Sequence, residues 1–265
     1  MFATTFSFEA MEATAADTAT TTPSIPNAGA IFCSEAPQYL GPIPPSEHHD
    51  TREVAFVGRS NVGKSSLVGA LFKEPSMVRS SKTPGRTRET LFFALGDRTH
   101  LPWPLLLVDL PGYGYARVGK NEQEDWEEKM QLYLIQRSSE QLKRVFVLGK
   151  FSLVAVLIKE SCGWSISPCC CCFFLVDARR EGMTERDIGM ATFLNAHNVQ
   201  FQLVLTKCDS VHSKEVARVA ALIVEQAWAF QHCVREIIAV SAKKERGLVE
   251  LRNAVLRSTG YTGKK

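Results

Sequence analysis

The chain has 265 residues, of which 45% are hydrophobic and 22% are charged. This length and balance predict one large globular domain with a single main core. The 31 Lys and Arg residues against 28 Asp and Glu residues give a formal net charge of +3. Such a small excess does not indicate a surface that coats nucleic acid, so any contact with RNA would have to be local.

Eight cysteines are present, but their spacing fits neither a disulfide framework nor a zinc site. Cys169 to Cys172 are consecutive and the others are scattered, without a Cys-x-x-Cys pair outside that run. Consecutive side chains point in divergent directions and cannot readily surround one tetrahedral ion. The pattern favours a reducing compartment.

Residues 1–34 are rich in Ala, Thr and Pro, and the first 50 residues contain no Lys or Arg. This composition predicts a disordered leader, because few large apolar side chains are available to offset the entropy of ordering. It resembles neither a secretory signal nor an Arg-rich organelle presequence. We expect the globular domain to occupy residues 35–265.

From Glu53 onward, short apolar runs alternate with amphipathic segments. Alternation of strands with helices predicts an α/β fold, with a mostly parallel sheet and helices on both faces. The predicted strands are VAFVG, PLLLVDLPG, RVFVL, VDARR, QFQLVLTK and REIIAVSAK, with a possible edge strand at LFFAL; the predicted helices are 65–72, 122–141, 185–196, 213–230 and 247–257.

The segment GRSNVGKSS matches G-x-x-x-x-G-K-[ST] between a predicted strand and a predicted helix. Backbone N–H groups and the positive end of the helix dipole can surround phosphate oxygens in such a P-loop. Lys64 is predicted to reach the β and γ phosphates, and Ser65 to offer its hydroxyl to Mg²⁺. The alternative is a Gly-rich turn with a chance Lys-Ser pair. The predicted nucleotide-binding residues are Gly58, Arg59, Ser60, Asn61, Val62, Gly63, Lys64, Ser65 and Ser66.

The tetrapeptide DLPG follows the apolar strand PLLLV. A carboxylate at that strand end can hold Mg²⁺ through water, and the Gly112 N–H can meet a γ-phosphate and turn away after hydrolysis. The sequence is common by itself and gains weight by following a P-loop. It predicts nucleotide binding by Asp109, Leu110, Pro111 and Gly112.

Two further motifs, TKCD and SAK, end the apolar strands QLVL and EIIAV. The Asp209 carboxylate can accept the N1–H and N2 amino protons of guanine, a pair of donors that adenine lacks, so it favours GTP over ATP. Lys207 is predicted to lie along the base and brace the P-loop, and the Ala242 N–H to meet the guanine O6. Each motif alone could be an ordinary strand-end turn. The residues predicted here are Thr206, Lys207, Asp209, Ser241, Ala242 and Lys243.

Residues 35–257 resemble the EngB subfamily of translation-factor-like P-loop GTPases, through EVAFVGRSNVGKSSL, SKTPGRTRET, DLPGYGYARV, VDARR and TKCD. The resemblance implies a small GTPase-like G domain that hydrolyses GTP to GDP and phosphate with Mg²⁺, as a switch in assembly of the large ribosomal subunit. The implied partners are GTP, GDP and a large-subunit precursor with its rRNA and ribosomal proteins. The bacterial family is also linked to cell division and septation. We expect a monomer without membrane contact, in a mitochondrion or plastid, with the cytoplasm as the alternative.

The resemblance also assigns residues by position. Thr87, with Gly85 and Arg86 in PGRT, matches a threonine that closes on Mg²⁺ in the GTP state, so the implied Mg²⁺ ligands are Ser65, Thr87 and Asp109. Asn61 matches an asparagine that helps to hold K⁺ beside the phosphates. The implied catalytic residues are Lys64, Thr87 and Gly112. Tyr113 stands where Ras-type proteins carry a water-orienting glutamine, so slow intrinsic turnover is expected.

Residues 149–175 interrupt the resemblance, because family members run this strand straight into its acidic end, in the manner of RVFLLIDAR, whereas here the insert separates RVFVL from VDARR. Lys159, Glu160 and Pro168 break this segment into apolar runs that are too short to span a bilayer. Palmitoylation of the cysteines is a further alternative, although they would sit between two halves of a core strand.

We interpret residues 149–175 as translated intron sequence. Gly149-Lys150 can be encoded by GGTAAG, which contains a splice-donor sequence, and the Cys and Phe run by pyrimidine-rich codons like those before a splice acceptor. Removing the codons in frame regenerates a valine at the junction. The alternative is a lineage-specific loop, but long inserts usually occur at loop tips.

Two classes of function remain open on this basis. One is a GTP-hydrolysing assembly factor, which the complete set of motifs favours. The other is a nucleotide-binding module without productive turnover, in which the insert disrupts the central sheet.

Overall fold

The computed structural model describes residues 5–7, 38–41, 52–59, 61–73, 90–95, 105–112, 133–134, 142–144, 171–180 and 182–260, and every structural statement below concerns these residues. Their strands form one nine-stranded sheet in the order β1-β9-β8-β7-β3-β5-β4-β2, with β6 (Leu142–Arg144) also paired to β3. The α/β class predicted from the sequence is confirmed.

The centre of the sheet is parallel. It contains β5 (Leu105–Asp109), β3 (Glu53–Val57), β7 (Cys171–Asp177), β8 (Gln200–Thr206) and β9 (Cys233–Ala239), each paired in parallel with the next. Every residue of β3 and β5 is buried. A strand covered on both faces requires a continuous apolar run, which is why VAFV and LLLV lack the polar alternation of a half-exposed strand.

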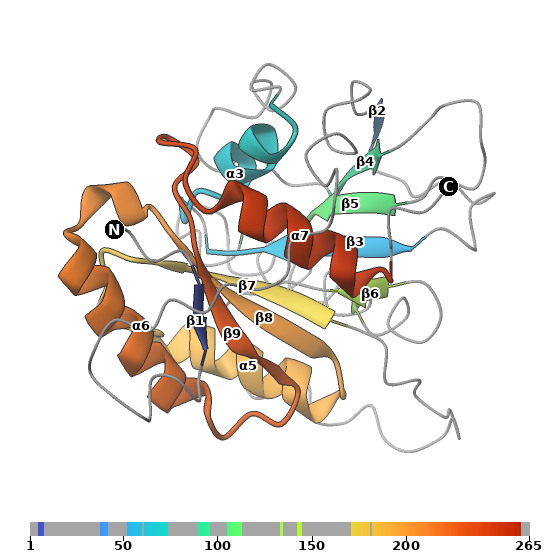
Figure 1. Cartoon of the computed structure of the whole chain (residues 1–265). Coiled ribbons are helices and arrows are strands. Elements are labelled where there is room, and N and C mark those ends of the chain that lie inside the picture. The colour runs from blue at the N-terminus through green and yellow to red at the C-terminus, as the bar shows by residue number, and fades with distance from the viewer. Residues whose placement is uncertain are drawn as a thin grey trace, which may run out of the picture.

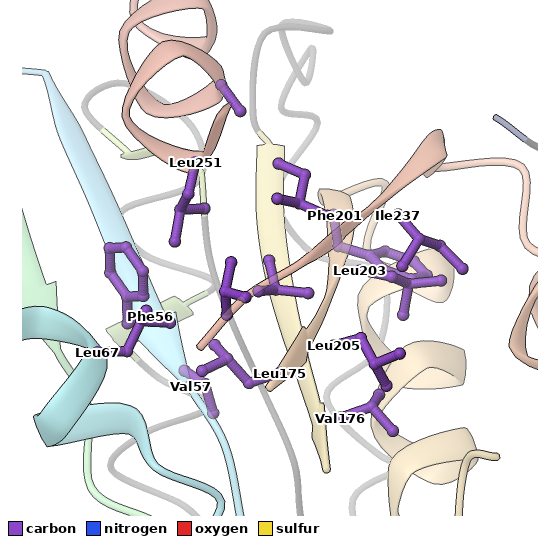
Figure 2. Packing of buried hydrophobic residues seen from close by; sticks show 14 of the residues in the cluster. Phe56, Val57, Leu67, Leu175, Val176, Phe201, Leu203, Leu205, Ile237 and Leu251 are labelled. Carbon is purple, nitrogen blue, oxygen red and sulfur yellow. The ribbon is translucent and has the colours of Figure 1, made fainter. Parts of the chain in front are cut away.

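Helices cover both faces of this sheet (Figure 1). In that view α7 (Leu248–Ser258) crosses in front of β3 with α3 (Lys64–Leu71) beside it, and α5 (Glu185–Ala196) lies behind β8 and β9. Figure 2 shows Leu67 of α3 and Leu251 of α7 gathered around Phe56 of β3.

The remaining long helix, α6 (Ser213–Ala227), buries Val216, Val219 and Ile223. These helices match the segments predicted from periodicity, whereas the predicted helix 122–141 lies outside the described residues except for Tyr133 and Leu134.

The strand β4 (Leu91–Leu95) is not the edge strand that the sequence suggests. It pairs antiparallel with β5 on one side and with β2 (Gln38–Gly41) on the other. The outer strand is short and contains a register shift between Tyr39 and Gly41. Four residues without a clear apolar alternation carry too weak a signal to be recognised as a strand.

A second difference lies in the segment predicted to be a disordered leader. Thr5–Ser7 forms β1, which pairs antiparallel with β9 through Thr5 and Ile238, Phe6 and Ile237, and Ser7 and Glu236. Phe6 is only 8% exposed and belongs to the main core. Burial of one large aromatic ring, together with backbone pairing to an open strand, orders these residues despite the polar composition around them.

A third difference concerns the strand beside β3, which has two segments. Glu53 and Val54 of β3 pair with Leu142 and Arg144 of β6, and Phe56 and Val57 pair with Phe173 and Phe174 of β7. The β7 strand begins at Cys171, not at Val176 as predicted, and all its residues are in register with β8. The sheet is therefore continuous at β7, which argues against disruption by the insert. The predicted residues 145–148 lie outside the described part.

β7 can begin at Cys171 because the residues before Val176 repeat the apolar pattern of RVFVL. Counting back from Val176, the run CCFFL (171–175) occupies the positions that RVFVL (144–148) would occupy if residues 149–175 were removed. Phe173 then corresponds to Phe146, and Leu175 to Leu148. Both runs are apolar enough for a strand that is buried on both faces.

We predict that a variant lacking residues 149–175 folds with RVFVL in place of CCFFL. Its melting temperature should rise by about 5 °C, because the chain no longer closes a long loop and loses the aggregation-prone run FSLVAVLI. Thermal melting and light scattering of both forms test this. A shortened variant that is insoluble or melts lower than a cooperatively folding full chain contradicts the prediction, as do transcripts that uniformly retain these codons.

Candidate functional site

The P-loop joins the end of β3 to the start of α3. Asn61 has a φ of 66° and Gly63 a φ of 105°, and the Val62 N–H donates to the Arg59 carbonyl over 3.1 Å. Gly63 is the N-cap of α3, no side chain among the described residues caps this helix start, and its first turn contains no acidic residue. Uncapped N–H groups at the positive end of a helix dipole favour an anion at this position.

Lys64 and Asp109 form a buried ion pair between the P-loop and the end of β5. The Lys64 Nζ lies 2.9 Å from Asp109 Oδ1, and the two side chains are only 6% and 0% exposed. The Ser65 hydroxyl donates to Asp109 Oδ2 over a long 3.4 Å. Three residues predicted from two separate motifs are thus brought together.

The same carboxylate suits a divalent cation. Within the described part of the chain, Asp109 Oδ1 is buried and receives no hydrogen bond, although the Lys64 ammonium compensates its charge. The Ser65 hydroxyl beside it adds a second hard oxygen donor, the type of ligand that Mg²⁺ prefers. These two side chains therefore fit the predicted Mg²⁺ site. Thr87, the third implied ligand, lies outside the described residues.

The end of β8 holds the P-loop from the other side. The Thr206 hydroxyl donates to the Val62 carbonyl over 2.8 Å and lies 3.2 Å from the Val176 carbonyl. The Lys207 ammonium donates to the Asn61 carbonyl. A Cβ built on Gly63 would lie 3.6 Å from Lys207 Cε, so the lysine stem passes directly along the loop. Lys207 therefore lies against the P-loop, where its predicted bracing role would act.

The TKCD and SAK motifs meet at the ends of β8 and β9. Ser241 Oγ donates to Asp209 Oδ1 over 2.6 Å, and it accepts a hydrogen bond from the Lys244 backbone N–H. The Ser241 hydrogen bond, opposed by partial burial, lowers the pKa of Asp209. Asp209 is therefore ionised at neutral pH and acts as an acceptor only.

Cys208, between Lys207 and Asp209, is a packing residue. It is 1% exposed, and burial raises the pKa of its thiol to about 12. Cys233 is also buried, and burial raises its pKa to about 12. Deep burial with a raised pKa is typical of structural cysteines and not of reactive ones. Among the described residues, no cluster of three His, Cys, Asp or Glu side chains could hold a metal ion.

Asp177, at the end of β7, belongs to this site but was not assigned a role from the sequence. Its carboxylate accepts hydrogen bonds from Lys207 Nζ at 2.9 Å and from Arg179 Nε and Nη2 at 2.9 and 2.7 Å. Burial opposes its ionisation, but these bonds outweigh it and lower the pKa of Asp177 to about 2. An acidic residue at the end of a buried strand, in VDARR, is the signal that could have indicated it.

The other residues predicted to bind nucleotide differ in how far they are exposed to solvent. Gly58, Leu110 and Pro111 are buried, Arg59, Gly112 and Ala242 are half-buried, and Ser66 and Lys243 are exposed. Ser60, Gly85, Arg86, Thr87 and Tyr113 lie outside the described residues. The individual roles predicted for the site residues stay predictions.

No described helix is long and apolar enough to cross a membrane.

The sequence matches the family described as 50S ribosome-binding GTPase over residues 53–207. It is 35% identical over 210 residues to a probable GTP-binding protein EngB of Bartonella quintana, covering 78% of this chain and 83% of that protein. It is 36% identical over 207 residues to the corresponding protein of Sinorhizobium medicae, covering 77% and 81% of the two chains.

Two solved structures share the fold. A probable GTP-binding protein EngB has a TM-score of 0.52 at 19% identity, covering 78% of this chain and 98% of its own. Aquifex aeolicus Era bound to GDP and AlF4⁻ has a TM-score of 0.51 at 20% identity, covering 78% and 56%. At this identity the likeness supports the fold alone.

We predict that Lys64→Ala weakens binding of a nucleoside triphosphate by at least about 100-fold, because a phosphate-binding lysine is lost. It also leaves Asp109 buried without a counter-charge, which should lower stability by about 3 kcal/mol. The double variant Lys64→Ala, Asp109→Asn separates the two effects, since it should regain stability but not binding. Equilibrium titration and thermal melting are the measurements, with Lys214→Ala, an exposed lysine on α6, as the control. Unchanged affinity in Lys64→Ala contradicts the assignment.

Proposed function

Because the chain belongs to the EngB family of GTP-binding proteins, within the wider 50S ribosome-binding GTPases, we propose that it hydrolyses GTP to GDP and phosphate as a switch in assembly of the large ribosomal subunit. The description of the matched family supports a ribosomal partner. We place the protein in a mitochondrion or plastid, where a precursor of that subunit would be the partner.

The observation that carries the guanine-nucleotide part of this proposal is the contact between Asp209 and Ser241. The Ser241 hydroxyl holds one oxygen of an ionised carboxylate, which can only accept hydrogen bonds. Guanine presents two donors on its N1 and N2 edge, whereas adenine presents an acceptor at N1. Lys207 connects this base site to the loop that would hold the phosphates.

At the phosphate end, the buried Lys64–Asp109 pair can separate when nucleotide and cation bind, since each side chain then gains a new partner of opposite charge. The Lys64 ammonium can move onto the β and γ phosphates, and Asp109 and Ser65 can then turn their oxygens to the cation. Bound Mg²⁺ would add positive charge against the phosphate oxygens. Each buried charge keeps an opposite charge throughout, which avoids the cost of an unpaired buried ion.

The hydrolysis step relies on positioning and charge more than on a protein base. Gly112 follows the Asp109 strand end and is half-buried, and its N–H can meet the γ-phosphate. Because Tyr113 replaces a water-orienting glutamine, we propose slow intrinsic turnover that K⁺ or the ribosomal partner accelerates.

We predict that Asp209→Asn exchanges guanine for xanthine specificity. Affinity for GDP should fall on the order of 100-fold, because the amide cannot accept both guanine protons, and affinity for xanthosine diphosphate should rise. Competition titrations against a labelled nucleotide measure both. Glu245→Gln, an exposed acid on the neighbouring loop, serves as the control and should bind GDP normally. Equal affinity of Asp209→Asn for GDP would remove Asp209 from the base site.

We also predict that replacing Na⁺ with K⁺ raises the rate of phosphate release from GTP, and that a variant of Asn61 abolishes the difference. The suitable variant is Asn61→Gly, because Asn61 has a φ of 66° and Ala would add backbone strain. Steady-state phosphate release in matched salts is the measurement. A rate that is indifferent to the cation in the wild-type protein contradicts the K⁺ role.

A further inference from the structure

The VDARR motif ends a central strand, yet none of its residues has a part in the function proposed above. The Asp177 side chain is only 8% exposed, and its two oxygens accept from three side-chain donors of Lys207 and Arg179. The Arg179 backbone N–H adds a fourth donor at 3.1 Å. A carboxylate with this many donors is fixed in place.

Two partners among the described residues hold the Lys207 side chain in position. Its backbone is left-handed, with a φ of 58°, and its ammonium bonds to the Asn61 carbonyl and to Asp177. The carbonyl is neutral, so Asp177 is the charged partner. Because the Lys207 side chain is 25% exposed, removing that charge would allow the ammonium to turn toward water and leave the P-loop.

Arg179 completes the arrangement from the surface. Its side chain is 52% exposed, but its Nε and Nη2 donate to the two different oxygens of Asp177, which is the bidentate pairing that arginine favours. It also attracts Asp209 across the site, which contributes to the raised pKa of the guanidinium after the larger effect of Asp177. The hydrogen-bond network therefore runs from the Asn61 carbonyl through Lys207 and Asp177 to Arg179.

We propose that Asp177 is a positioning residue that keeps guanine nucleotide from leaving, by holding Lys207 against the P-loop. The inference rests on guanine-nucleotide binding at this site. Asp177 acts through Lys207 and has no direct contact with the nucleotide, and Arg179 keeps its carboxylate turned toward the lysine.

The test measures dissociation of GDP that carries a methylanthraniloyl fluorophore, chased with excess unlabelled GDP. Asp177→Asn keeps the size of the side chain and removes its charge, so release should be roughly fivefold faster, as expected for a partly exposed charge-assisted bond. The control Glu225→Gln makes the same change on an exposed acid of α6 and should release GDP at the wild-type rate.

A double-mutant cycle separates positioning from general stability. In a Lys207→Ala background, Asp177→Asn should cause no further acceleration, because the residue through which it acts is absent. An equal acceleration in that background overturns the proposal, as does release from Asp177→Asn within twofold of wild type.

If Asp177→Asn does not fold, Arg179→Ala is the deciding variant, because the Arg179 side chain is 52% exposed and its removal leaves Asp177 and Lys207 in place. It should release GDP about threefold faster than wild type, and its control is Arg180→Ala, the exposed neighbour. A folded Arg179→Ala with the wild-type release rate overturns the proposal. Failure of the wild-type protein to bind the labelled GDP would instead overturn the proposed function on which the inference rests.

Discussion

The parallel pairing of β5, β3, β7, β8 and β9 places the carboxyl ends of five strands at one edge of the sheet. The P-loop follows β3, Asp109 ends β5, Asp177 ends β7, Lys207 follows β8 and Ser241 lies just beyond β9. Residues far apart in the chain meet because each stands at the same end of its strand. The site is thus a direct product of strand direction, and the polar contacts refine positions that the backbone has already set.

Much of the site could be predicted from the sequence because each motif combines an apolar run with a polar end. Such a run indicates a buried strand, and its last residue then has a known place. The Asp177–Lys207 pair could not be predicted in this way. It depends on β7 lying between β3 and β8, and strand order is not encoded by any single segment. The Asp209–Ser241 contact has the same dependence, because it requires β8 to lie beside β9.

The predictions for β7 and β1 differ from the structure for another reason. The start of β7 differs from the predicted one because CCFFL and RVFVL have the same apolar character, and the pattern of residues alone does not show which of them precedes Val176 in the strand. β1 has only three residues, which is too short for a period to be detected. It is ordered by the partner it meets, since Phe6 joins a core built almost entirely from residues after Glu53.

The pairing of β1 with β9 bears on how the chain folds during synthesis. Of the described strands, β1 is made before all others and β9 after all others, yet residues 5 and 238 are neighbours in the sheet. β1 must therefore wait for almost the whole domain before it can pair, and contacts between such distant residues form slowly. Until then the outer edge of β9 carries free backbone donors and acceptors, and these are the groups through which strands of separate molecules join. Closure of this edge is expected to be the last event in folding of the sheet and the one most open to competition from a second nascent chain.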